Sequence, residues 1–173
     1  MSASGKFVSG GIVAVTAAFG IGVYYAQVYG YYETFSQGDV SLTSLESGQP
    51  ERIPVTTFEA IDADSSPIRY RACFTTTLST ALLTETFTTL DKSEPRNAPD
   101  WFECFDANQI GEDLKASLAT AYMGQANYEF GIHRLVAISD VCRASVFLQS
   151  NVFGDTLSEA PPSTCHFTTS VPL

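Results

Sequence analysis

A long uncharged segment near the N-terminus is the strongest pattern of apolar and polar positions in the chain. From Phe7 to Tyr32 there is no Asp, Glu, Lys or Arg, and this length exceeds the roughly 20 residues that a helix needs to cross the hydrocarbon core of a bilayer. We therefore predict a transmembrane helix over residues 7–32, preceded by a short N-terminus at residues 1–6. A cleaved signal peptide with Val15-Thr16-Ala17 at its cleavage site is the alternative.

Two patterns within this segment predict how it sits in a membrane. Tyrosines crowd its C-terminal end, as in the aromatic belt of a membrane interface, namely Tyr24, Tyr25, Tyr29, Tyr31 and Tyr32. Small residues recur at every fourth position, which would let another helix approach closely, namely Gly10, Ala14, Ala18, Gly22, Ala26 and Gly30. We expect the first set to face the headgroups and the second to pack against other transmembrane helices.

The flanking charges predict the orientation of the helix. Lys6 stands before the segment, whereas Glu33, Asp39 and Glu46 follow it. Because positive charge is retained on the cytoplasmic side, we expect a single-pass membrane protein with its N-terminus in the cytoplasm and its C-terminal domain on the other side of the membrane.

The remaining chain predicts one small α+β domain. Residues 33–50 are rich in Ser, Gly and Asp and read as a tether or a weak edge strand, and residues 151–173 as an extended tail. Between them, residues 51–150 alternate repeatedly between apolar and polar positions, which indicates an antiparallel sheet. We expect one helix to pack on that sheet, which gives an α+β domain. We also expect disulfides in this domain.

The elements of this domain are predicted with unequal support. Residues 68–75 alternate as a strand, and residues 132–138 and 144–149 form a hairpin. Residues 78–89 carry both helical and strand spacings, and their many threonines favour a strand. Asp106 is a candidate helix N-cap, followed at every fourth position by the apolar residues Ile110, Leu114, Leu118 and Tyr122 and then by Gly124 as a helix end.

Composition excludes some partners. The chain has 173 residues, a net charge of -10 and only nine Lys and Arg, which suits one acidic domain and argues against nucleic-acid binding. An acidic surface could attract a basic soluble protein.

An Asp-rich stretch, Asp62 to Ser66, resembles a calcium loop but lacks its glycine and terminal glutamate, so we interpret it as a turn.

Four cysteines, Cys73, Cys104, Cys142 and Cys165, are an even set in a domain expected outside the cytoplasm, which predicts disulfides. Three connectivities are open, and we favour Cys73 with Cys104 and Cys142 with Cys165. The cysteines lack the close spacing of zinc or haem sites.

No catalytic motif of the common hydrolase, P-loop, metalloprotease or dinucleotide-binding kinds occurs in the sequence. His133 reads as an exposed strand residue, and His166 is interpreted in the same way. We therefore expect no enzyme activity, no metal and no cofactor.

The stretches AIDADSSPIRYRACF, WFECFDANQIGEDL, GIHRLVAI and YYAQVYGYYE resemble an uncharacterised family of single-pass proteins from Rhodobacter-type alphaproteobacteria. Members often carry the automatic label "histidine kinase", which this chain contradicts because it is too short for the kinase domains. The resemblance implies a Gram-negative cell, in which the protein would be anchored in the inner membrane with its C-terminal domain in the periplasm. It supplies no activity. It also implies that a Gly-containing turn usually stands where Cys142 is found, that Cys73–Cys104 is the shared bridge, and that Cys142–Cys165 would be a second one.

Two functions are compatible with these features. The first is a non-catalytic accessory subunit of an inner-membrane complex, for example a respiratory or photosynthetic one, with a basic soluble protein such as a cytochrome c as a further partner. The alternative is a periplasmic ligand-binding, sensory or assembly-assisting module with a pocket lined by Trp101, Phe102 and Tyr122.

Overall fold

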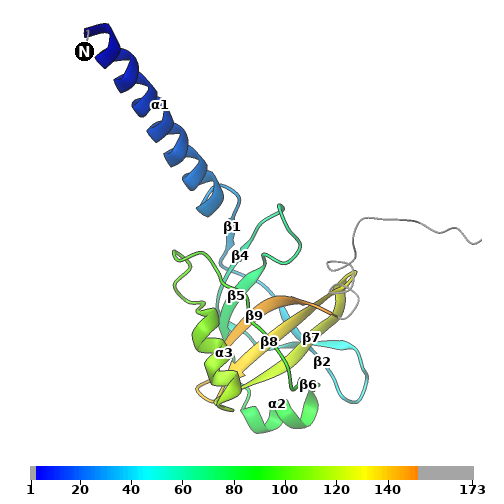
Figure 1. Ribbon diagram of the computed structural model, residues 1–173. Helices are drawn as coiled ribbons and strands as arrows, with labels where there is room; N and C mark the ends of the chain where they lie inside the picture. The colour runs from blue at the N-terminus through cyan, green and yellow to red at the C-terminus, as the bar shows by residue number, and fades with distance from the viewer. Residues whose placement is uncertain (1–2, 152–173) are drawn as a thin grey trace, which may run out of the picture.

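The computed structural model describes residues 3–151, in which one long helix projects from a small α+β domain (Figure 1). The long helix is α1 (Ala3–Val28). The elements of the domain follow in the order β1 (Glu33–Phe35), β2 (Val40–Thr43), β3 (Pro50–Ile53), β4 (Thr56–Asp62), β5 (Arg71–Thr75), α2 (Thr80–Thr86), β6 (Thr89–Leu90), α3 (Ala107–Lys115), β7 (Ala119–Glu129), β8 (Ile132–Ser139) and β9 (Arg143–Ser150).

Most strands join one seven-stranded sheet in the order β1-β4-β5-β9-β8-β7-β6, and each neighbouring pair is antiparallel. Strands β2 and β3 form a separate antiparallel pair. The predicted α+β class, with an apolar N-terminal helix and an antiparallel sheet, is confirmed. The predicted hairpin is also confirmed, because β8 pairs with β9 from Ile132↔Ser150 to Ile138↔Ala144.

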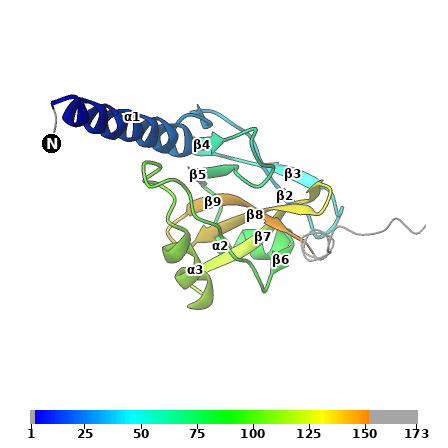
Figure 2. The same cartoon turned by 45° about the horizontal axis from the view of Figure 1, so that its top comes forward.

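The sheet is apolar on both faces, because its strands bury residues of both alternating sets. On β8, Val136 and Ile138 enter one core cluster, whereas Leu135 and Ala137 enter another. The first cluster is covered by α2 and by the β2–β3 pair. The second is covered by α3 and by residues 98–105, and Figure 2 shows α3 and the β2–β3 pair apart from one another around the sheet. The domain therefore has three layers.

Residues 33–50, expected to be a tether or a weak edge strand, form strands over much of their length, and β1 is the edge strand of the main sheet. Strand β1 pairs with β4, and β2 pairs with β3. On β2, Val40 and Leu42 are 4% and 0% exposed and belong to the first core cluster. Burial of these apolar side chains offsets the cost of ordering a segment rich in Ser and Gly. The segment is part of the folded domain.

The strand predicted over residues 78–89 is instead mainly α2. Ser79 caps this helix, its hydroxyl accepting a hydrogen bond from the Leu82 amide at 3.4 Å. The hydroxyls of Thr84 and Thr86 donate to the carbonyls four residues earlier, at 2.8 and 2.7 Å. Leu83 is fully buried against the sheet. Packing of that one side chain outweighs the weak preference of threonine for strands.

The predicted helix after Asp106 is present but shorter than expected. Asp106 caps it, since its carboxylate accepts from the amides of Asn108 and Gln109 at 2.9 and 3.1 Å. The helix ends at Lys115, and Ser117 has a φ of 59°, so the chain reverses there. Tyr122 and Gly124 lie on β7 instead, because residues 119–123 pair with β8.

Two turns agree with the sequence analysis. The Ala63 amide donates to the Asp62 carboxylate at 2.8 Å, so the Asp-rich stretch binds its own backbone as predicted. In the β8–β9 turn, Cys142 has a φ of 60°, a conformation that glycine adopts without steric cost.

The strand predicted over residues 68–75 is present but shorter, since β5 begins only at Arg71.

We expect Leu42→Ala to lower the free energy of unfolding by about 2–5 kcal/mol, because it leaves a cavity in a filled core. The matched control is Leu45→Ala, in the same segment but 58% exposed, for which a change within about 0.5 kcal/mol is expected. Urea unfolding of the full chain in detergent, followed by circular dichroism, measures both. Equal, small effects would mean that residues 33–50 are a tether after all.

Candidate functional site

Helix α1 is a candidate transmembrane helix, which suggests membrane anchoring. Within residues 3–151, it is the one helix long and apolar enough to cross, from Gly5 to Val28, and this span is unburied. Large apolar side chains along it are open, with Phe7, Phe19 and Ile21 at 82%, 74% and 70% exposure. The predicted apolar helix is thus present and could cross a membrane, although it ends at Val28 rather than Tyr32.

The small-residue face of α1 touches nothing else in the described chain over most of its length. A Cβ atom added to Gly10 or Gly22 would meet no atom within 4 Å, and Ala14 and Ala18 are exposed. Gly30 lies beyond the helix end, where an added Cβ would approach the Ala26 backbone at 3.1 Å. The open part of the face is therefore Gly10 to Gly22. Whether another helix packs on it stays a prediction.

The five predicted belt tyrosines divide into two groups. Tyr24 and Tyr25 lie on α1, whereas Tyr29, Tyr31 and Tyr32 lie in the segment that connects it to β1. Tyr29 stacks on Tyr25 with ring centroids 5.5 Å apart. Tyr29 and Tyr32 also contact the folded domain, so they have a structural role that the sequence analysis did not predict.

Trp101 forms the main contact between the helix end and the domain. Its indole Nε1 donates to the Val28 carbonyl at 2.8 Å, one of the carbonyls that lack a partner within the helix. Its ring stacks on Tyr29 at 6.0 Å and meets Tyr32 edge-on at 5.8 Å. We call these four residues the junction.

The segment that carries Trp101 is held to the sheet by a covalent bond. Cys104 forms a disulfide with Cys73 on β5, with Cα atoms 6.2 Å apart and a sequence separation of 31 residues. Phe102 and Phe105 beside it are buried in the second core cluster. In the chain-entropy model, closing a loop of this size contributes about 3 to 4 kcal/mol. Trp101 is thus presented from a rigid segment.

This disulfide is one of the two that we favoured from sequence. It also indicates an oxidising compartment for the domain. Cys142 has a free thiol within the described residues and donates weakly to the Leu78 carbonyl at 3.9 Å. Cys165 lies outside the described residues, so the Cys142–Cys165 bond stays a prediction.

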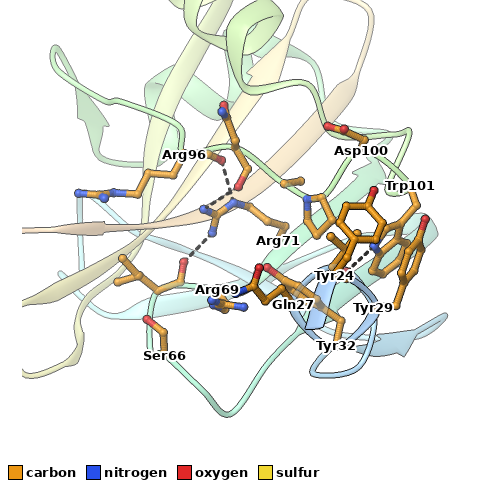
Figure 3. A pocket seen from close by; sticks show the side chains of 15 residues that line it. Tyr24, Gln27, Tyr29, Tyr32, Ser66, Arg69, Arg71, Arg96, Asp100 and Trp101 are labelled. Atoms are coloured by element: carbon orange, nitrogen blue, oxygen red, sulfur yellow. Dashed lines mark hydrogen bonds between the residues drawn. The ribbon is translucent and has the colours of Figure 1, made fainter. Parts of the chain in front are cut away.

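Next to the junction lies an open groove of about 620 Å³, which we call the junction groove (Figure 3). One wall comes from the end of α1, with Tyr24, Gln27 and Val28, and another from residues 96–101. Arginine is prominent among the remaining lining residues, since the groove contains Arg69, Arg71 and Arg96. Three of the nine cations of an acidic chain therefore gather at one place.

The pocket predicted from sequence does not exist as such. Trp101 lines the junction groove, but Phe102 is buried in the second core cluster and Tyr122 in the first. The Tyr122 hydroxyl lies 3.0 Å from that of Thr84. The sequence analysis did not identify the arginines of the junction groove as a site, because they form no motif and Arg96 is far from the other two in the chain.

Arg71 is the most buried of these arginines, at 4% exposure. Its guanidinium donates to the carbonyls of Arg96 at 2.9 Å and of Ile68 and Tyr70 at 2.7 Å each. Burial lowers the pKa of Arg71 to about 10, so the side chain remains charged near neutral pH. Among residues 3–151, no carboxylate pairs with it. Arg71 organises the backbone of the groove wall and leaves a positive charge there.

Other candidate groups have structural roles. The Nδ1 atom of His133 accepts from the Asn127 amide at 3.0 Å, and burial lowers the pKa of this half-buried imidazole. Arg134 lies between the rings of Tyr70 and Tyr128, at 4.9 and 3.8 Å from their centroids. Over the part of the chain that the structure describes, no three His, Cys, Asp or Glu residues form a group that could hold a metal ion. His166 lies outside it.

Because Trp101 is the one tryptophan in the chain, its fluorescence reports on the junction. Tyr29→Ala removes a ring contact of about 0.5–1.5 kcal/mol, and we expect red-shifted emission and stronger acrylamide quenching. Tyr31→Ala is the matched control, since Tyr31 is 56% exposed and has no ring contact with Trp101 among the described residues. Identical quenching of the two variants would contradict the junction.

Comparison with known proteins gives a family but no activity. No curated protein and no solved structure matches the chain. A family model described as "Family of unknown function (DUF6446)" matches residues 40–165, which is more than two thirds of the sequence. The match begins at Val40, the first residue of β2, in the segment expected to be a tether. The chain therefore belongs to this family of unknown function.

Proposed function

We propose that the protein is a non-catalytic accessory subunit of an inner-membrane complex, such as a respiratory or photosynthetic one. Its anchor would pack against other transmembrane helices, and its acidic domain would lie in the periplasm. The observation that most supports this role is the junction, in which Trp101 connects the end of α1 to a disulfide-bonded segment. A domain that works independently of its anchor, on a flexible tether, would not need such a connection.

A fixed junction has a consequence for assembly. A subunit that contacts a complex both within and outside the membrane must present its two surfaces at a constant relative position. The hydrogen bond to Val28 and the rings of Tyr29 and Tyr32 restrict the rotation of α1 relative to the domain. Less orientational freedom is then lost when the subunit binds, which strengthens binding without new contacts.

The membrane contact would use the open face from Gly10 to Gly22. In lipid there is little hydrophobic drive between helices, so association depends on close packing, which small side chains allow. A Cβ atom added to Gly22 would meet no other atom of residues 3–151 within 4 Å. An effect of a larger side chain there would therefore indicate a partner.

The orientation and the acidity complete the proposal. Lys6 on one flank and acidic residues on the other favour a cytoplasmic N-terminus, and a disulfide is compatible with the periplasm. A net charge of -10 would attract a basic soluble partner, of which a cytochrome c is one example, and accelerate its encounter with the complex.

The second candidate is a periplasmic ligand-binding, sensory or assembly-assisting module. The observation that favours it is the junction groove, which is large enough for a small ligand. The groove is open and lies at the helix end, rather than enclosed in the domain. It is compatible with a subunit role as well.

We expect the double variant Ala18→Leu, Gly22→Leu to lose co-purifying membrane proteins after extraction in mild detergent. The loss should be about tenfold, corresponding to about 1.4 kcal/mol, because leucine prevents close approach of the partner helix. Quantitative mass spectrometry of affinity-purified full chain measures it.

Gly20→Leu is the matched control, since this glycine also has no atom within 4 Å of an added Cβ but lies about 160° around the helix from both positions, at 100° per residue. It should retain the partners. A wild-type chain that purifies alone, or equal losses in both variants, would contradict an accessory role through this face.

A further inference from the structure

We propose that the junction groove binds the phosphate of an anionic phospholipid headgroup. This inference depends on the membrane anchor and not on the accessory-subunit role. It rests on three properties of the groove, namely its level relative to the membrane, its charge and the chemistry of its walls.

The groove lies at the level of the headgroups. The span from Gly5 to Val28 has 24 residues, which at about 1.5 Å per residue is roughly 36 Å, slightly more than the roughly 30 Å hydrocarbon core. The last turns of α1 therefore reach the interface. Tyr24, Gln27 and Val28 on these turns line the groove, so its helical wall is in the headgroup region.

The groove is positive in an otherwise acidic protein. Arg69, Arg71 and Arg96 line it against a single carboxylate, Asp100, and none of the three forms an ion pair within residues 3–151. In Figure 3, Asp100 lies near Trp101, well apart from Arg69. The net charge of the lining residues attracts an anion that the rest of the surface would repel.

The arginines are prepared to bind rather than to pair internally. Arg71 is fixed by its carbonyl partners, whereas its Nη2 atom has only a long 3.5 Å bond to the Asn97 carbonyl. The guanidinium of Arg69 lies 5.6 Å from the ring centroid of Tyr32, which restricts it at the groove wall. The guanidinium of Arg96 is exposed and extends away from Arg71 and Trp101 in Figure 3, so Arg69 and Arg71 are the two arginines directed at the groove. Planar guanidinium groups match phosphate oxygens in pairs of hydrogen bonds.

The other walls favour a lipid over a free anion. Val28, Ile68 and Trp101 provide apolar surface beside the arginines, and Tyr24 and Gln27 provide polar groups. A glycerophospholipid presents the same combination, with phosphate next to a glycerol backbone and acyl chains. A bilayer anchored protein also meets lipid headgroups at high local concentration, whereas a free phosphate must diffuse in.

The test uses the full chain in detergent and native mass spectrometry with added phosphatidylglycerol or phosphatidylcholine. We expect the wild type to retain phosphatidylglycerol preferentially. Arg69→Gln should lower phosphatidylglycerol occupancy by about tenfold, since an arginine–phosphate contact is removed. Arg143→Gln is the matched control with the same change in charge, and it should bind like the wild type because Arg143 does not line the groove.

Thermal unfolding and Trp101 emission show whether each variant is folded. If Arg69→Gln does not fold, Arg69→Lys, which keeps the charge but not the paired hydrogen bonds of a guanidinium, should still weaken retention of phosphatidylglycerol. Equal retention of the two lipids, or equal loss in groove and control variants, would overturn the proposal. Displacement of the lipid by millimolar inorganic phosphate would do so as well, because it would identify a free-anion site.

Discussion

The central sheet must be covered on both faces, and most of the structure follows from this constraint. Val136 and Leu135 are neighbours on β8, yet both are buried, on opposite sides. One face requires α2 and the β2–β3 pair, and the other requires α3 and the segment before it. A small chain has few segments that can cover two sheet faces. Segments with a polar composition, such as residues 33–50, therefore also become part of the folded domain.

Covering the second face also positions the membrane anchor. Phe102 and Phe105 are buried there, and the disulfide at Cys104 holds the same segment to β5. Trp101 is consequently placed at the end of α1, where it binds the Val28 carbonyl. The orientation of the membrane helix is therefore linked to the core of the domain through a few consecutive residues. Because the segment also forms a wall of the junction groove, the groove is built by the same constraint.

Sequence reasoning succeeded where local signals and the tertiary fold agree. The uncharged run of α1, the alternation of the β8–β9 hairpin and the Asp106 cap each have a local physical cause. It failed where long-range packing decides. Leu42 lies among Ser and Thr and gives no local sign of burial, and Tyr122 continues a helical spacing although its pairing with Val136 makes it a strand residue.

The candidate site was less predictable than the fold, because its residues meet only in three dimensions. Arg69, Arg96 and Trp101 come from two loops, and Tyr29 from the segment that connects α1 to β1. The belt tyrosines were identified by their type, but their contact with Trp101 depends on where the disulfide holds that residue. A cysteine pair suggested from sequence thus proved more informative about the site than any functional motif.

The sheet ends on two short strands, β1 with three residues and β6 with two. Edge strands expose unpaired backbone groups that can template the addition of a strand from another chain, and short edges offer little such backbone. A partner that meets the domain at these two edges gains few main-chain hydrogen bonds. Such a partner must be recognised mainly through side chains, which makes binding selective. The short edges also limit self-aggregation in a protein concentrated at a membrane surface.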